Sequence, residues 1–307
     1  MDSPRNCPVC ESASALHDFA DKNGYAIQRC DACDHLFVDP LPTSEALAEL
    51  YSAEVGYMPL AKELSTAPIP QRFTDRLAAI RRHRSSGRLL DVGCSHGQFL
   101  RVAASDGFEP VGVELNADTA EVARSLGFEV AIGTLEGVGF DDASFDIIHL
   151  GDLLEHAPDA RGLLREVRRL LRADGIVAIA TPNHDAFFPR TTRTVSRALG
   201  IAWSHPTPPY HVHQFSRGSL DQLLGRVGLE RLDIRYETIP LGYEIRQTLI
   251  GPLLREALRD RAPLRAARYA VFGALGALSY ATLASIERIL PTASPRAQME
   301  VIAGPRR

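Results

Sequence analysis

The segment 89–100 (LLDVGCSHGQFL) constrains the fold more than any other part of this 307-residue chain. An apolar run ends in Asp91, enters a turn of small residues that includes Gly93 and Gly97, and continues in a helical pattern. Such a turn lets backbone N–H groups approach a ligand closely at a helix N-terminus, where the helix dipole favours negative charge. The segment therefore predicts a strand, a turn and a helix that suit a nucleotide-like cofactor.

A second apolar run, residues 111–115, has Glu114 near its C-terminal end. The acid follows the turn by roughly 20 residues, where a carboxylate meets the ribose hydroxyls of a nucleoside in doubly wound sheets. Similar runs alternate with helical patterns, and we expect strands near residues 88–93, 110–115, 127–131, 144–150, 175–181, 229–236 and 298–303. This alternation predicts an α/β fold with a Rossmann-like doubly wound sheet. Asp118 and Glu121 fit a capping box at the second helix.

These segments together resemble motifs I and II of the class I S-adenosylmethionine-dependent methyltransferases. The resemblance continues through three later segments, residues 145–156, 163–171 and 175–183. One position departs from the family's Asp-x-Gly-x-Gly-x-Gly loop, because Ser95 stands at its middle glycine. Serine is small enough to keep the close backbone approach. The resemblance implies S-adenosylmethionine as the cofactor and methyl transfer as the activity.

The resemblance also implies which residues bind that cofactor. The methionine end would lie against the turn after the first strand, at Asp91, Gly93, Cys94, Ser95 and Gly97. The ribose hydroxyls would donate to Glu114, and Gly151 and Asp152 would close the pocket after the fourth strand. The adenine would be flanked by residues of two loops, Leu115, Thr134, Leu135 and Glu136. We do not expect Cys94 to act as a nucleophile, because it is a small side chain in a turn.

Four of the five cysteines form two CxxC pairs, Cys7 with Cys10 and Cys30 with Cys33. Two such turns supply the four thiolates of a structural zinc site, with no position left open for water. Short strand-like pieces with an Asn-Gly turn at residues 23–24 lie between the pairs, as in a zinc ribbon. A pair of disulfides or redox-active dithiols is the alternative. The ribbon could close over the cofactor cleft, bind substrate or bind a partner.

Methyl transfer to a hydroxyl needs a base near the cofactor, and three segments offer one. His156 follows Glu155 at the mouth of the cleft, although this dipeptide could also cap the loop structurally. His211 and His213 alternate in residues 209–216, so both would lie on one side of an extended segment. They could be a base and an orienting group, a metal pair or part of a packed loop. The third segment is residues 183–185 (NHD), just beyond the fifth strand.

Net charge and hydropathy indicate which partners the chain is expected to have. A net charge of −4 gives no field that would hold a polyanion, so nucleic acid is not the expected partner. No signal segment opens the chain, which predicts a cytoplasmic protein. Residues 270–286 carry no charge but are shorter than a membrane span. They could form a buried helix, a homodimer contact, or, with residues 266–290 as a whole, a peripheral contact with the inner face of a membrane.

The complete pattern predicts a zinc ribbon, a cofactor-binding domain and a helical insertion. The expected boundaries are 1–40 for the ribbon, 41–85 for a helical linker, 86–240 for the Rossmann-like domain, 241–295 for the helical insertion and 296–307 for the final strand. Zinc-ribbon methyltransferases of this type resemble enzymes that act on sugars, so we expect O-methylation of a sugar, glycan or lipid-linked acceptor. The alternatives are an RNA methyltransferase that uses the ribbon to bind nucleic acid and a non-catalytic zinc-binding partner protein.

Overall fold

The computed structural model describes most of the ribbon and of the α/β domain. The described residues are 6–13, 16–22, 24–42, 68–187, 189–191, 193–194, 208–237, 282, 285, 289 and 296–306. The chain divides into two compact units. The first comprises Met1–Thr181, Pro208–Ile234 and Glu300–Arg307, and the second comprises Pro182–Thr207 and Arg235–Met299.

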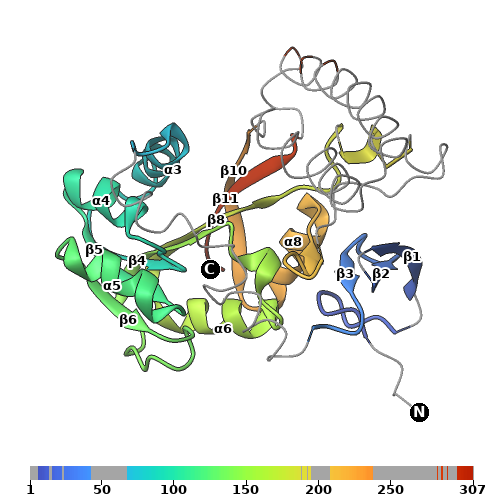
Figure 1. The fold of residues 1–307 in the computed structure, drawn as a ribbon, viewed down its shortest axis with the longest axis horizontal. Coiled ribbons are helices and arrows are strands. Elements are labelled where there is room, and N and C mark those ends of the chain that lie inside the picture. The colour runs from blue at the N-terminus through green and yellow to red at the C-terminus, as the bar shows by residue number, and fades with distance from the viewer. Residues whose placement is uncertain are drawn as a thin grey trace, which may run out of the picture. The chain divides into compact units, whose positions relative to one another are not determined.

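A seven-stranded sheet forms the centre of the fold, in the order β10-β11-β8-β7-β4-β5-β6 (Figure 1). The strands are β4 (Arg88–Val92), β5 (Glu109–Glu114), β6 (Glu129–Ile132), β7 (Phe145–Gly151), β8 (Leu171–Pro182), β10 (Leu229–Glu237) and β11 (Gln298–Pro305). Parallel pairing joins β6 to β5, β5 to β4, β4 to β7 and β7 to β8. The α/β fold predicted from the alternating pattern is confirmed, and each expected strand appears within a few residues of its predicted place.

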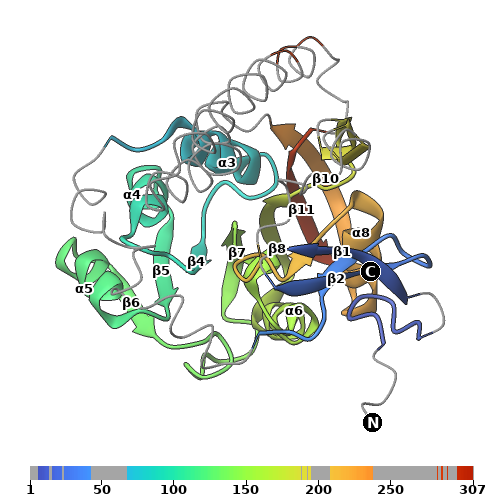
Figure 2. The ribbon, with the colours of Figure 1, turned by 45° about the vertical axis from the view of Figure 1, so that its right-hand side comes forward.

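The strand order reverses at β4. From β4 the chain proceeds to β5 and β6 on one side and then returns to β7 and β8 on the other, which Figure 2 shows with β7 between β4 and β8. In open α/β sheets this switch point, at the carboxyl ends of the strands, is where ligands bind. The β4 and β7 ends therefore locate the candidate site.

Helices pack against this sheet, and one of them is capped differently from the expectation. They are α3 (Gln71–Arg81), α4 (Gln98–Ser105), α5 (Ala117–Ser125), α6 (Ala160–Leu170) and α8 (Arg217–Arg226), with a short 3₁₀ turn, η1 (Leu154–His156). The expected capping box of Asp118 with Glu121 is wrong. The cap is Asn116, whose side chain accepts from the backbone N–H of Thr119 at 3.0 Å, so the helix begins one residue before Asp118.

The main core cluster lies between the sheet and the first two of these helices. Leu77 and Ile80 of α3 and Phe99 of α4 are buried together with Leu89 of β4 and Ile147 of β7. Burying these apolar side chains stabilises the positions of β4 and β7, because each contributes on the order of 1.5–3 kcal/mol when removed from water. The site at the strand ends is thus mounted on rigid elements.

The N-terminal ribbon forms a second sheet, with strands in the order β1-β2-β3-β9. Its strands are β1 (Leu16–Lys22), β2 (Tyr25–Cys30), β3 (Leu36–Val38) and β9 (His213–Gln214), paired antiparallel. The expected hairpin joins β1 to β2, since Lys22 pairs with Tyr25, and Gly24 has the positive φ of 79° that such turns use. The fourth strand was not expected, because it follows β8 in the chain. The ribbon sheet therefore extends past the predicted boundary at residue 40.

Several expectations fall on residues outside the described part of the chain. These are most of the helical linker at 41–85, most of the insertion at 241–295 and nearly all of the apolar stretch at 266–290. Among the described residues, no helix has the length and apolar character needed to cross a membrane.

Candidate active site

The turn after β4 has the left-handed backbone that a close approach requires. Gly93, Ser95 and Gly97 have φ angles of 74°, 50° and 77°. The backbone N–H groups of Gly93 and Cys94 both donate to the Val113 carbonyl of β5, at 2.8 and 3.0 Å. The substitution of Ser95 for glycine thus keeps the backbone conformation, although a non-glycine residue there costs about 1–2 kcal/mol.

Glu114 ends β5 and is held by the same turn. One carboxylate oxygen accepts from the Ser95 N–H at 3.0 Å and the other from the Asn116 N–H at 2.9 Å. Burial raises the pKa of Glu114, while these N–H groups favour the ionised form. Two fixed oxygens with remaining acceptor capacity are what a vicinal diol, such as that of a ribose, requires.

Beside this carboxylate the surface is apolar. Leu115 is 58% exposed and Ile132 is 40% exposed, while Leu135 is buried and Thr134 is exposed. The exposed leucine and isoleucine, at the carboxyl ends of adjacent strands, form an apolar surface against which a planar base such as adenine can pack.

The thiol of Cys94 turns away from this ligand surface. Burial, together with the charges of Asp91 and Glu114, raises the pKa of Cys94 far above that of an ordinary thiol. Its Sγ occupies the space that a Cβ on Gly112 would need, at 2.6 Å. The side chain packs between β4 and β5, and its burial disfavours the thiolate.

A buried hydrogen bond joins β4 to β7 at the switch point. His149 Nδ1 lies 2.7 Å from Asp91 Oδ1, and the Phe99 ring stacks on His149 with the centroids 3.9 Å apart. Both polar side chains are almost fully buried. The contact fixes the Nδ1–H tautomer of His149 and leaves Nε2 as the remaining polar atom.

Arg76 of α3 reaches the same place from outside the sheet. Its Nε donates to Glu300 of β11 and its Nη2 donates to Asp152, each at 2.9 Å. Burial lowers the pKa of Arg76, but the charges of Asp152 and Glu300 outweigh it, so the pKa is raised and the guanidinium stays charged. No sequence pattern indicates this arginine, because its partners lie far from it in the chain.

Two buried polar atoms meet above Gly151. A Cβ at this position would lie 2.9 Å from His149 Nε2 and 3.1 Å from Arg76 Nη1. Neither nitrogen has a hydrogen-bond partner among the described residues. Buried polar atoms are rarely left unpaired, so this space fits a polar or anionic group of a ligand.

Gly151→Ala is expected to weaken cofactor binding by about tenfold or more and to destabilise the protein by about 1–3 kcal/mol. The new Cβ would lie 2.4 Å from His149 Cε1, so the buried imidazole must shift and its bond to Asp91 must lengthen. Calorimetry with S-adenosylhomocysteine and thermal unfolding measure the two effects. Gly225→Ala in α8 is the control, because a Cβ there meets nothing within 4 Å. Equal affinities of the two variants would contradict the assignment.

Beyond β7 the chain forms η1, which carries a buried carboxylate and a histidine. Glu155 Oε2 accepts from Thr181 Oγ1 at 2.9 Å, and burial raises the pKa of Glu155 to about 8, with the charge of Asp152 adding to the effect. His156 Nδ1 donates to the Tyr210 carbonyl at 2.8 Å, which leaves Nε2 as the atom with a lone pair, 3.9 Å from Glu155. Burial lowers the pKa of His156, so the ring is neutral at pH 7.

His211 joins this cluster. Its ring meets His156 edge to face, with centroids 4.7 Å apart. Glu155, His156 and His211 each offer an atom within 4.8 Å of the others, which is close enough either for proton transfer or for a divalent cation. Two of the predicted catalytic residues, His156 and His211, are therefore brought together.

The other predicted bases lie elsewhere. His213 is in β9 and contacts His35 of the ribbon, with Nδ1 3.1 Å from His35 Nε2, and burial lowers its pKa to about 4. His211 and His213 thus have different partners rather than forming the expected pair. In the second unit, Asn183 donates through its backbone N–H to Ala297 and through its side chain to Arg296, while His184 is buried.

Glu155→Gln is expected to stabilise the protein at pH 8 and not near pH 4.5. A carboxyl whose pKa rises from 4.5 when unfolded to about 8 when folded costs stability as the pH rises through that window. Glutamine keeps the acceptor for Thr181 without ionising. Thermal unfolding should give a melting temperature higher by about 4 °C or more at the alkaline end. A gain of equal size at both pH values would contradict this explanation.

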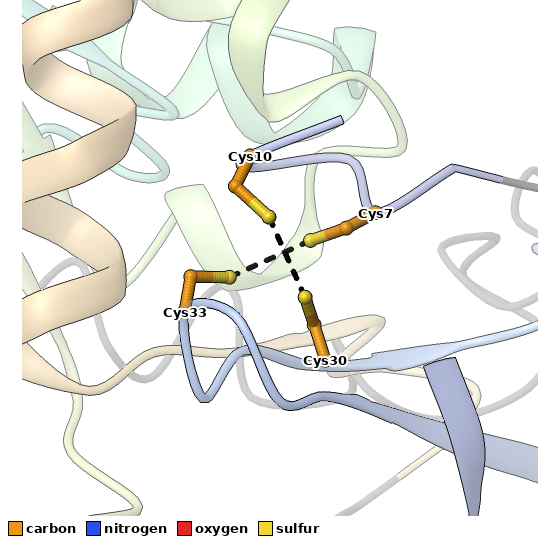
Figure 3. A group of neighbouring side chains, drawn as sticks. All are labelled: Cys7, Cys10, Cys30 and Cys33. Atoms are coloured by element: carbon orange, nitrogen blue, oxygen red, sulfur yellow. Dashed lines mark hydrogen bonds between the residues drawn. The ribbon is translucent and has the colours of Figure 1, made fainter. Parts of the chain in front are cut away.

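The four N-terminal thiols point at one centre (Figure 3). Cys7 Sγ lies 3.6 Å from Cys33 Sγ, and Cys10 Sγ lies 3.4 Å from Cys30 Sγ. A tetrahedral zinc with bonds of about 2.3 Å needs sulfur atoms about 3.8 Å apart, close to these values. All four thiols are free, and a disulfide would need about 2.05 Å. The cluster fits a closed, structural zinc site better than two disulfides.

Known proteins share this fold and these segments. The family model "Methyltransferase domain" matches residues 63–234, more than half of the chain. The 27-O-demethylrifamycin SV methyltransferase of Amycolatopsis mediterranei is 29% identical over 117 residues, which cover 35% of this chain and 43% of that protein. The ubiquinone biosynthesis O-methyltransferase of Hahella chejuensis is 29% identical over 150 residues, which cover 47% of this chain and 56% of that protein.

A solved structure agrees on the fold. The S-adenosylmethionine-dependent methyltransferase from Archaeoglobus fulgidus is 18% identical and has a TM-score of 0.50 over 80% of this chain and 99% of that one. The chain spans about half the length of the first curated relatives it matches. The matched domain includes the β4 turn, Glu114 and the His156 cluster. The chain therefore belongs to the methyltransferase-domain family and has the class I Rossmann-like fold.

Proposed function

We propose that this methyltransferase acts on a hydroxyl oxygen of a sugar, glycan or lipid-linked acceptor, and that His156 with His211 accepts the hydroxyl proton. The observation that carries the proposal is the cluster of the buried Glu155 with the half-buried His156 and His211 beyond the carboxyl end of β7. Titratable groups with shifted pKa values at such an edge suit proton removal from an acceptor.

S-adenosylmethionine supplies a methyl group on a sulfonium, and transfer in line exchanges the C–S bond for a C–O bond and leaves S-adenosylhomocysteine. His156 Nε2 takes the proton from the hydroxyl, because its Nδ1 is engaged by the Tyr210 carbonyl. The His211 ring restricts the His156 ring from one edge. Glu155 Oε1 lies 3.9 Å from His156 Nε2, where the charge of the imidazolium that forms would favour ionisation of this carboxyl.

The proposed cofactor site joins the residues expected from the sequence with two that only the geometry suggests. Glu114 would accept from the ribose hydroxyls, and Asp152 and Gly151 would close the methionine end. Arg76 Nη1 would donate to the carboxylate of the methionine, and His149 Nε2 would accept from its ammonium group, since both nitrogens lack a partner among the described residues. The other proposed contacts are Asp91, Gly93, Cys94, Ser95, Gly97, Leu115, Thr134 and Leu135.

The choice of acceptor rests on two supports. O-methylation is favoured by the names of the rifamycin and ubiquinone relatives, which are O-methyltransferases. A sugar, glycan or lipid-linked acceptor is favoured by the ribbon, whose four cysteines lie together, since zinc-ribbon methyltransferases of this type resemble enzymes that act on sugars. We also propose a structural Zn²⁺ on Cys7, Cys10, Cys30 and Cys33. A peripheral membrane contact through residues 266–290 and a homodimer stay predictions.

Calorimetric titration with S-adenosylmethionine and S-adenosylhomocysteine is the first test. Binding of both at micromolar affinity, about −8 kcal/mol, would support the cofactor site, and binding of neither would contradict it. A radiolabelled methyl donor is then offered with a panel of nucleotide sugars and lipid-linked glycans, and the methylated atom is located by mass spectrometry and NMR. A methyl group on carbon or nitrogen would contradict the proposed oxygen, and salt-dependent RNA binding by the full chain would favour the RNA alternative.

A further inference from the structure

We propose that the metal-bound ribbon is a wall of the acceptor site, in which β3 holds β9 so that His211 stays against His156, with His213 as a positioning residue. The inference rests on the proposed function, because it assumes that this histidine pair meets the acceptor. It predicts that the ribbon controls methyl transfer and not cofactor binding.

A continuous line of backbone hydrogen bonds joins the ribbon to the turn that carries Glu155 and His156. Phe37 of β3 pairs with His213 of β9. The Val38 N–H donates to the Val212 carbonyl at 2.9 Å, and the Val212 N–H donates to the Glu155 carbonyl at 2.9 Å. A single residue, Val212, thus links the ribbon sheet to the turn that carries Glu155 and His156.

A contact between the side chains of His35 and His213 lies along the same line. His35 and His213 are both almost completely buried, with the ring nitrogens 3.1 Å apart and the centroids 5.2 Å apart. The Phe215 ring packs on His35 at 4.8 Å. The second cysteine pair fixes His35, since its carbonyl accepts from the Cys30 N–H at 2.9 Å. The turn at Cys30 and Cys33 therefore fixes His35, and His35 in turn fixes His213.

The first cysteine pair is attached to two helices of the methyltransferase domain, α6 and α8. Arg161 of α6 donates to the carbonyls of Pro8 and Val9 at 3.0 and 3.1 Å, and Arg226 of α8 donates to the Cys10 carbonyl at 2.7 Å. Glu11 accepts from both arginines. The ribbon is thus joined to the methyltransferase domain at both of its cysteine pairs.

These contacts separate the two halves of the site. The cofactor turn is held by bonds within β4 and β5, through Val113, Glu114 and Asn116. The acceptor cluster is held by Val212, whose other partner belongs to the ribbon. Small metal ribbons lose their structure when the metal is removed. Loss of zinc should therefore loosen residues 211–213 and leave the cofactor turn in place.

The test compares zinc-loaded full-length protein with protein stripped by a chelator and with His35→Ala, which needs no change in metal content. S-adenosylhomocysteine affinity should stay within about threefold. The Val212 amide should exchange at least about tenfold faster, and the ¹³C-labelled ring signals of His156 and His211 should shift, returning when zinc is restored. Unchanged exchange at Val212, or a parallel loss of S-adenosylhomocysteine affinity, would overturn the inference.

Variants distinguish positioning from catalysis. With an acceptor from the panel, His35→Ala, His213→Ala and the double variant should lower kcat by similar factors and leave its pH profile unchanged, as expected for a coupled pair. Arg226→Ala should weaken the ribbon attachment, whereas Arg231→Ala, which removes a pair with Asp221, is the control. A pH profile altered by His213→Ala alone would make His213 catalytic and overturn its positioning role. Failure of the wild type to bind S-adenosylhomocysteine would contradict the proposed function, while Val212 exchange would still decide the ribbon inference.

Discussion

His156→Ala is expected to lower kcat by about 10²–10⁴-fold while the affinity for S-adenosylhomocysteine stays the same. The imidazole ring of His156 is the part of the residue that belongs to the cluster with Glu155 and His211. The proposed cofactor contacts come instead from the β4 turn and Glu114. Steady-state kinetics with an acceptor from the panel and calorimetry measure the two quantities. Added imidazole should restore part of the lost rate, which a purely structural defect would not allow.

The pH dependence of kcat tests the same role of His156 as a base. A base must be unprotonated, so kcat should fall at acidic pH as His156 gains a proton. Because burial lowers the pKa of His156, this acidic limb should lie below the ordinary histidine value of about 6.5. His83→Ala, which removes a histidine near Asp233, should leave both kcat and the limb unchanged. Loss of cofactor affinity in His156→Ala, without loss of kcat, would contradict the assigned role.

Glu114→Ala is expected to weaken S-adenosylhomocysteine binding by at least about 100-fold. The carboxylate would accept from two ribose hydroxyls, and hydrogen bonds to a charged group contribute about 1.5–3 kcal/mol each. The substitution also leaves the N–H groups of Ser95 and Asn116 without their acceptor. Glu114→Gln should give an intermediate affinity, since one acceptor remains.

Glu121→Ala is the matched control for this prediction. Glu121 lies on α5 and pairs with Arg124 at the surface, away from the carboxylate of β5. Calorimetry should find wild-type affinity for this variant. If Glu114→Ala also bound S-adenosylhomocysteine as tightly as the wild type, the ribose assignment would be wrong.

The sequence predicted the parts of the site that are local in the chain. Asp91, the glycine turn and Glu114 lie on two successive strands, and their spacing is fixed by a single helix between them. The two cysteine pairs could also be predicted from the sequence, because each CxxC turn orients its own two thiols. The predicted helix cap failed for a local reason, since Asn116, two residues before Asp118, already caps the helix through the Thr119 N–H.

Contacts between distant residues were decided only by the tertiary structure. Arg76 and Glu300 are 224 positions apart, and His35 and His213 are 178 positions apart. Alternation put His211 and His213 on one side, but pairing of β9 with β3 directs one toward the ribbon and leaves the other against His156. Periodicity and spacing determine secondary structure and ligand types, because these depend on neighbouring residues. The buried arginine, the histidine partners and the fourth ribbon strand depend on which surfaces meet after folding, and no local pattern encodes that.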